Sequence, residues 1–155
     1  MRRITAKLTL IVAIAVGIAI AFPNESDAAK RRQQEIPMLQ SLSQLSPNQL
    51  LVTYDRPVDK VKGVTATNYW IQSTTEAVPT GIATLGMNDQ VSPSNALTAA
   101  KVTIAAADNQ NQSFILTFNQ NITQGKPYKM IICYVTVPGG PPYSGDNGSA
   151  AFVGR

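Results

Sequence analysis

The residues of this sequence that could do chemistry are few, and the stretch YDRPVDKVKGVTATNYWI holds two of them. Asp55 and Asp59 lie four residues apart, and two neighbouring carboxylates are the usual pair for general acid and base catalysis. Pro57 lies between them and blocks ladder pairing, so nothing in the pattern forces the two side chains together. The stretch is better explained as a structural joint between two strands. The residues that we expect to form this joint are Tyr54, Pro57, Asp59, Asn68 and Tyr69.

The other candidates for catalysis or metal binding are weak. The chain has no histidine, which removes the commonest general base and the commonest metal ligand. Asp146 and Asn147 offer oxygen atoms for calcium, but calcium sites use six to eight oxygens, and a turn explains the pair better. We therefore expect that the chain is not an enzyme and that it binds neither a metal ion nor a cofactor.

A single cysteine, Cys133, lies in an apolar run and cannot form a disulfide within the chain. Strand alternation puts Ile131, Cys133 and Val135 on the face opposite the core, where polar residues are usual. One interpretation is that a loop covers this strip or that a bulge shifts the register. The other is that the strip is a contact surface for a second copy or another protein, where the thiol could cross-link two chains.

Three aromatic residues are candidates for facing a ligand, as in a carbohydrate-binding module. They are Trp70, Tyr134 and Tyr143. The alternative is that these rings belong to the core or to strand edges.

Charge excludes nucleic acid as a partner. The chain of 155 residues has a net charge of +4, with 13 Lys and Arg against nine Asp and Glu. Six of these cations and two of these anions lie in the first 32 residues, which leaves seven of each from Gln33 onward. A balanced domain has no bulk attraction for phosphate backbones or anionic lipid.

The N-terminal sequence MRRITAKLTLIVAIAVGIAIAF has basic residues followed by an apolar run that is short for a membrane span. We expect residues 1–29 to form a helical secretory signal peptide, with residues 30–35 as a basic lead-in and residues 36–155 as one domain. If the signal is not cleaved, it would attach the protein to a membrane. Either outcome predicts an extracytoplasmic location, secreted or at the cell surface.

Beyond Ile36, short alternating segments separated by Pro, Gly, Asn and Asp are typical of an all-β protein. Strands are expected near residues 36–45, 48–55, 68–73, 100–106, 113–119, 128–137 and 149–154. The gaps hold no helical crossovers, so the pattern predicts an antiparallel sandwich of about seven strands. Residues 73–100 are expected to hold an edge strand near 81–85 and a loop.

Three segments, LLVTYDRPVD, ATNYWI and FILTFNQNITQGKPYKMIIC, resemble the bacterial immunoglobulin-like (Ig-like) domain of S-layer proteins, of the SbsA type. The resemblance covers roughly residues 42–153. The sequence GGPPYSGDNGSAAF departs from it, being longer and richer in proline than the usual approach to the last strand. The resemblance implies an Ig-like β-sandwich with a structural or adhesive role, acting through protein contacts in a surface layer or filament. A carbohydrate-binding module on a similar sandwich is the alternative.

Overall fold

The computed structural model describes residues 36–155. The expected signal peptide (residues 1–29) and lead-in (30–35) therefore lie outside the described residues. The strands of this part are β1 (Leu39–Ser46), β2 (Gln49–Tyr54), β3 (Tyr69–Ser73), β4 (Val102–Ala106), β5 (Ser113–Phe118), β6 (Pro127–Cys133) and β7 (Asp146–Val153). Helical turns are short: α2 (Lys60–Val64), η1 (Ala66–Asn68) and η2 (Pro93–Asn95). None of these turns is long or apolar enough to cross a membrane.

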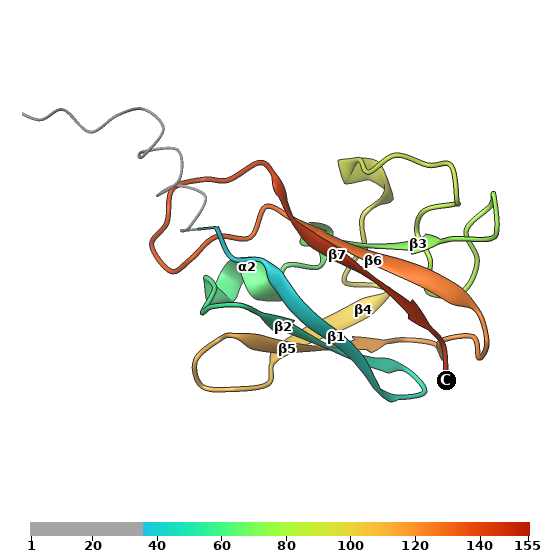
Figure 1. The fold of residues 1–155 in the computed structure, drawn as a ribbon, viewed down its shortest axis with the longest axis horizontal. Helices are drawn as coiled ribbons and strands as arrows, with labels where there is room; N and C mark the ends of the chain where they lie inside the picture. The colour runs from blue at the N-terminus through green and yellow to red at the C-terminus, as the bar shows by residue number, and fades with distance from the viewer. Residues whose placement is uncertain (1–35) are drawn as a thin grey trace, which may run out of the picture.

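The seven strands form two antiparallel sheets, which Figure 1 shows as two layers. One sheet has the order β1-β2-β5-β4 and the other the order β3-β6-β7. If the strands are lettered A to G along the chain, these orders are A-B-E-D and C-F-G, the arrangement of the constant-type immunoglobulin fold. The predicted all-β antiparallel sandwich is confirmed.

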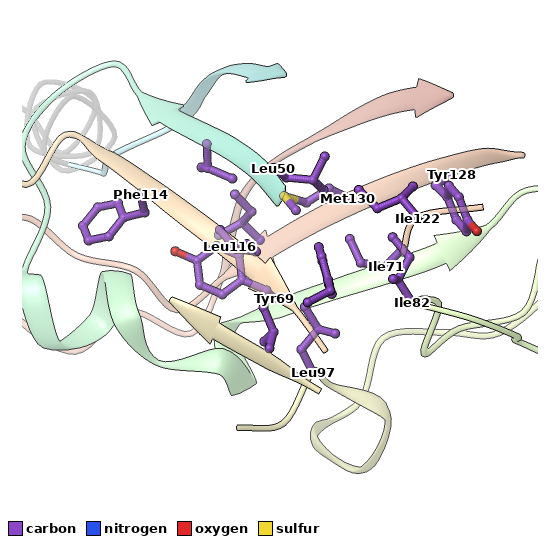
Figure 2. Packing of buried hydrophobic residues seen from close by; sticks show 14 of the residues in the cluster. Leu50, Tyr69, Ile71, Ile82, Leu97, Phe114, Leu116, Ile122, Tyr128 and Met130 are labelled. Atoms are coloured by element: carbon purple, nitrogen blue, oxygen red, sulfur yellow. The ribbon is translucent and has the colours of Figure 1, made fainter. Parts of the chain in front are cut away.

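Period-two alternation explains how the two sheets bury one core. In β2 and β5 every second side chain is buried and the others are half-buried. The buried residues of the two strands face each other in register, with Leu50 opposite Leu116 and Val52 opposite Phe114. From the other sheet, Ile71 and residues of β6 complete the same cluster (Figure 2). The apolar side chains leave water together, which stabilises the contact between the layers.

The end of β6 departs from the predicted alternation. Tyr134 is expected on the core face and Val135 on the outer face, but the structure places Val135 fully in the main core. The cause is local: the β6–β7 ladder shifts register after Ile131, and Tyr134 has a φ of 69°. The register shift and the positive φ together interrupt the alternation, so the next side chain points to the side opposite the expected one.

Two segments between strands also differ from the expectation. The predicted edge strand near residues 81–85 is reduced to one isolated parallel bridge between Gln72 and Leu85. The segment from Asp59, expected as a loop, folds into α2, because the Asp59 carboxylate accepts a hydrogen bond from the Lys62 amide at the helix start. Gly63 in this helix packs against Phe114 so closely that a Cβ there would overlap the ring.

Candidate functional site

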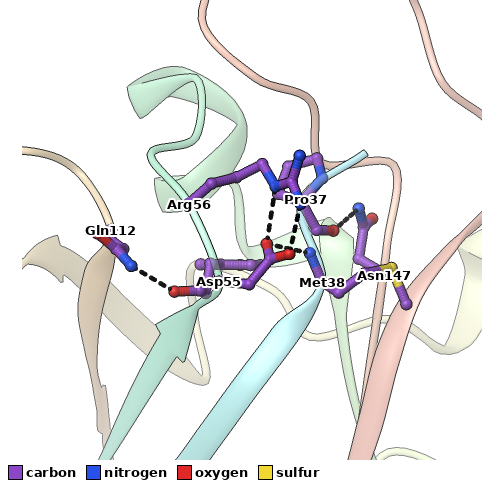
Figure 3. A network of polar contacts seen from close by, with 7 residues as sticks. Pro37, Met38, Asp55, Arg56, Gln112 and Asn147 are labelled. Atoms are coloured by element: carbon purple, nitrogen blue, oxygen red, sulfur yellow. Dashed lines mark hydrogen bonds and ion pairs between the residues drawn. The ribbon is translucent and has the colours of Figure 1, made fainter. Parts of the chain in front are cut away.

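Asp55 and Asp59 have separate structural roles. The Asp55 carboxylate accepts hydrogen bonds from the Met38 amide at 2.9 Å and from the Arg56 guanidinium at 2.7 and 3.1 Å (Figure 3). Arg56 is also the main reason why the pKa of Asp55 lies below its usual value. Asp59 caps α2, and its own amide donates to the Thr136 carbonyl at 2.7 Å. A carboxylate fixed by these donors is poorly suited to proton transfer.

Two tyrosines, the last residue of β2 and the first residue of β3, form a buried hydrogen-bonded chain. The Tyr69 hydroxyl donates to the Gly63 carbonyl at 2.6 Å and lies 2.9 Å from the Tyr54 hydroxyl. Because the Tyr69 hydroxyl already donates its proton to the Gly63 carbonyl, the Tyr54 hydroxyl must be the donor in the bond between the two tyrosines. Tyr54 belongs to one sheet and Tyr69 to the other, so this chain links the layers through the core.

The remaining joint residues surround this chain. Asn68 is buried and its side-chain amide donates to the Lys62 carbonyl at 2.9 Å, which fixes the end of α2 above β3. Pro57 is exposed just beyond the end of β2. Burial raises the pKa of both tyrosines, because ionised phenolate would lose its hydration in the core. The stretch YDRPVDKVKGVTATNYWI is thus a crossover between sheets.

The outer face of β3 and of the end of β6 is covered by the segment that follows β3. Trp70 is fully buried there, with Leu85, Ala96 and Cys133. Its indole N–H lies 3.0 Å from both the Ser92 carbonyl and the Asn95 side-chain oxygen. The long segment of residues 73–100 therefore serves as a lid over this part of the sheet.

The candidate interaction strip is not one exposed surface in the monomer. Ile131 is half-buried, Cys133 is only 8 % exposed beneath the lid, and Val135 lies in the main core. A covering loop and a register shift, both considered from the sequence, account for this arrangement. Burial also raises the pKa of the Cys133 thiol, with a smaller contribution from Asp146.

We predict that Cys133 reacts slowly with thiol reagents while the protein is folded. Burial and the raised pKa both lower the fraction of reactive thiolate, so the rate should fall on the order of 100-fold below that of the unfolded chain. Absorbance with an aromatic disulfide reagent, with and without denaturant, measures both rates. Equal rates, or a dimer band in non-reducing electrophoresis, would show that the lid leaves the thiol accessible.

The three candidate ligand-facing aromatics do not form a platform. Trp70 is buried, so it cannot stack on a sugar, and Tyr134 packs edge-on against it with ring centroids 5.9 Å apart. Tyr143 is half-buried, and its hydroxyl donates to the Asp146 carbonyl at 2.9 Å. The expectation that Trp70 faces a ligand is therefore corrected. That prediction was wrong because no pattern in the sequence indicates that residues 92–97 fold back onto the Trp70 ring.

Tyr143 lines an apolar pocket of about 260 Å³ at one end of the sandwich. The walls come from the residues that precede β1 and from the proline-rich loop between β6 and β7, including Pro37, Val137 and Pro142. The polar groups beside it are already paired: the Val135 backbone bonds to Asn147, and Thr136 accepts from Asp59. The pocket thus offers apolar surface without a polar group to orient a substrate.

Asn147 is a structural residue that the sequence pattern does not reveal. Its side chain is fully buried at the start of β7, where a turn or calcium ligand was considered. The side-chain oxygen accepts from the Val135 amide, and the side-chain nitrogen donates to the Val135 and Pro37 carbonyls, all at 2.8 Å. Figure 3 shows the bond to Pro37. Asn147 therefore joins the segment before β1 to the loop after β6. Among residues 36–155, no group of acidic or cysteine side chains could hold a metal ion.

No protein-family model matches the sequence, and no curated protein matches it either. Solved structures do match in fold. The crystal structure of the S-layer protein rSbsC(31-844) aligns with a TM-score of 0.52 and 15 % identity over 83 % of this chain and 15 % of that one. The N-terminal part of the bacterial S-layer protein SbsC aligns with a TM-score of 0.50 and 14 % identity, over 83 % of this chain and 26 % of that one. At this identity the likeness concerns the fold alone, and this chain spans only a fraction of the S-layer protein's length.

Proposed function

We propose that this chain is an extracytoplasmic Ig-like module with a structural role at the cell surface, acting through contacts with other proteins. The observation that carries the proposal is the two-sheet fold, which is similar to part of a bacterial S-layer protein. The basic and apolar N-terminal sequence supports export. The fixed positions of Asp55 and Asp59 favour a structural role over catalysis.

The location is tested with the full chain carrying a C-terminal epitope tag in a bacterial host. We expect the tagged chain in the medium or on intact cells, where added protease degrades it before lysis. The matched control is Ile14→Arg with Val16→Arg, which places two charges in the apolar run and should retain the chain in the cytoplasm. Protection of the unsubstituted chain in intact cells, with Met1 still present, would contradict the proposal.

A further inference from the structure

The outer face of the β1-β2-β5-β4 sheet has a composition that suits docking. One row of side chains crosses all four strands in ladder register: Ser43, Leu51, Ile115 and Ala105. Ser43 and Ala105 are exposed on the edge strands, and the two larger side chains are half-buried between them. The centre of this face, which we call the neutral face, is therefore apolar.

Polar side chains beside this row are paired with each other. The Thr53 and Ser113 hydroxyls lie 3.4 Å apart on one side, and the Gln49 amide donates to the Thr117 hydroxyl at 3.1 Å on the other. Polar groups that already have partners lose less on leaving water than free ones. Covering the neutral face is thus less costly than its Ser and Thr content suggests.

Charge is absent from this sheet. None of the strands β1, β2, β4 and β5 contains Asp, Glu, Lys or Arg, whereas β6 contains Lys129 and β7 begins with Asp146. Cores of protein interfaces are depleted in charge and charged residues lie at the rim. Lys101 and Asp108 occupy such rim positions, just before and just after β4, and both are half-buried.

The opposite sheet is less available for a similar contact. Its β3 and the end of β6 lie beneath the lid over Trp70, and the open edge of β3 is bonded to that lid through the Leu85, Leu97 and Thr84 amides. On that sheet only β7 has an uncovered outer side within the described residues, with Ser149, Ala151 and Val153 exposed, so the neutral face is the broader open sheet face.

We propose that the neutral face binds the neutral face of a second copy of this chain, related by a two-fold axis that crosses the strands. Two identical faces meet without like-charge repulsion if the centre of the contact is uncharged and the charges at its rim are self-complementary. An axis across the strands reverses their direction, so Lys101 of each copy lies at the end where the other copy has Asp108. An axis along the strands would instead place β4 of one copy over β1 of the other, so the Lys101 and Asp108 residues of the two copies would lie at opposite edges and form no such pairs. This inference rests on the proposed surface role for its biological meaning.

The size of the face implies weak association. Four strands about 4.8 Å apart and about six residues of 3.3 Å each give roughly 400 Å² of flat area per copy. A stable interface buries about 800 Å² per partner. The contact therefore forms at high local concentration, as between modules held side by side in a layer, where many weak contacts act together.

Cysteine cross-linking of the purified full chain tests the axis. In a Cys133→Ala background, Ala105→Cys and Ser43→Cys lie on the crossing row, so each should meet its own equivalent and form a disulfide-linked dimer. The control is Val78→Cys, an exposed position in the segment of residues 73–100, which is bonded to β3 of the opposite sheet. We expect several-fold more dimer at positions 105 and 43 than at position 78 under the same oxidation, by non-reducing electrophoresis and mass spectrometry.

A second pair of variants tests the face itself. Ile115→Lys in the Ala105→Cys chain places two lysines near the axis and should abolish the dimer, while the neutral Ile115→Thr should retain it. Thermal melts establish that both variants are folded. The proposal is overturned by dimer yields at 105 and 43 no higher than at 78, or by disulfides that form only between the position-43 and position-105 variants when the two are mixed. Because the experiment uses purified chain, its outcome is independent of where the cell places the protein.

Discussion

Replacing Asn147 by alanine is expected to lower the free energy of unfolding by about 3–5 kcal/mol. The substitution removes three buried hydrogen bonds and leaves the Val135 amide and the Val135 and Pro37 carbonyls without partners. An unpaired buried polar group costs about 1–3 kcal/mol, because it has lost water as well as its partner. Urea denaturation of the full chain, followed by circular dichroism, measures the change.

Two further substitutions separate the hydrogen bonds from other effects. Asn147→Asp keeps the shape and the acceptor but loses both donations to carbonyls, so at neutral pH it should be at least as destabilising as alanine. Asn121→Ala removes an exposed asparagine and should change stability by less than about 0.5 kcal/mol. If Asn147→Ala cost no more than Asn121→Ala, the buried amide would not hold this end of the sandwich together.

Tyr69→Phe is expected to cost about 2–3 kcal/mol and Tyr54→Phe about 1 kcal/mol. Tyr69 both donates to the Gly63 carbonyl and accepts from Tyr54, so its loss leaves two buried groups unpaired. Removal of the Tyr54 hydroxyl loses one hydrogen bond and leaves the Tyr69–Gly63 bond intact. Chemical denaturation of both single variants and the double variant gives the ranking and the coupling free energy. Equal effects of the two single substitutions would contradict the donor order.

The same pair predicts a loss of stability in alkali. Burial raises the pKa of both hydroxyls in the folded state above the value of about 10 found in an unfolded chain. The unfolded state therefore releases protons first, and stability that is complete below pH 10 falls as the pH rises above it. The urea midpoint measured between pH 8 and pH 11 should drop less steeply in the Tyr69→Phe variant. An unchanged slope would mean that other tyrosines govern the alkaline transition.

Sequence alternation predicts most of this fold because the core is built from side chains that repeat every second residue. Leu50, Val52, Phe114 and Leu116 are all found where that period places them. The antiparallel sandwich is predicted by the same period-two alternation together with the short connections between strands. Pro57 lies just beyond the end of β2, as expected of a residue that blocks ladder pairing, whereas Asp59 begins a short helix where a loop is expected.

The parts that sequence could not predict depend on contacts between distant segments. Alternation places Trp70 on the outer face of its sheet, where a ligand could reach it. In the structure Ser92 and Asn95 fold over the ring, and no residue near position 70 indicates that contact. Asn147, next to glycine, has the composition of a turn, yet its amide serves groups 12 and 110 residues away. Tyr134 escapes prediction because a register shift and a positive φ together interrupt the alternation there.

The central claim is that the residues with the best chemistry, Asp55, Asp59, Tyr69 and Asn147, hold the sandwich together through their hydrogen bonds. Hydrogen exchange at the amides of Val135, Asp59 and Gly63 tests it most directly, because all three lie outside the strands and are bonded only through these joints. The account predicts exchange as slow as that of Leu116 in β5, limited by opening of the whole domain. Exchange within minutes, as in an exposed loop, would show that the joints open freely, and would contradict the claim.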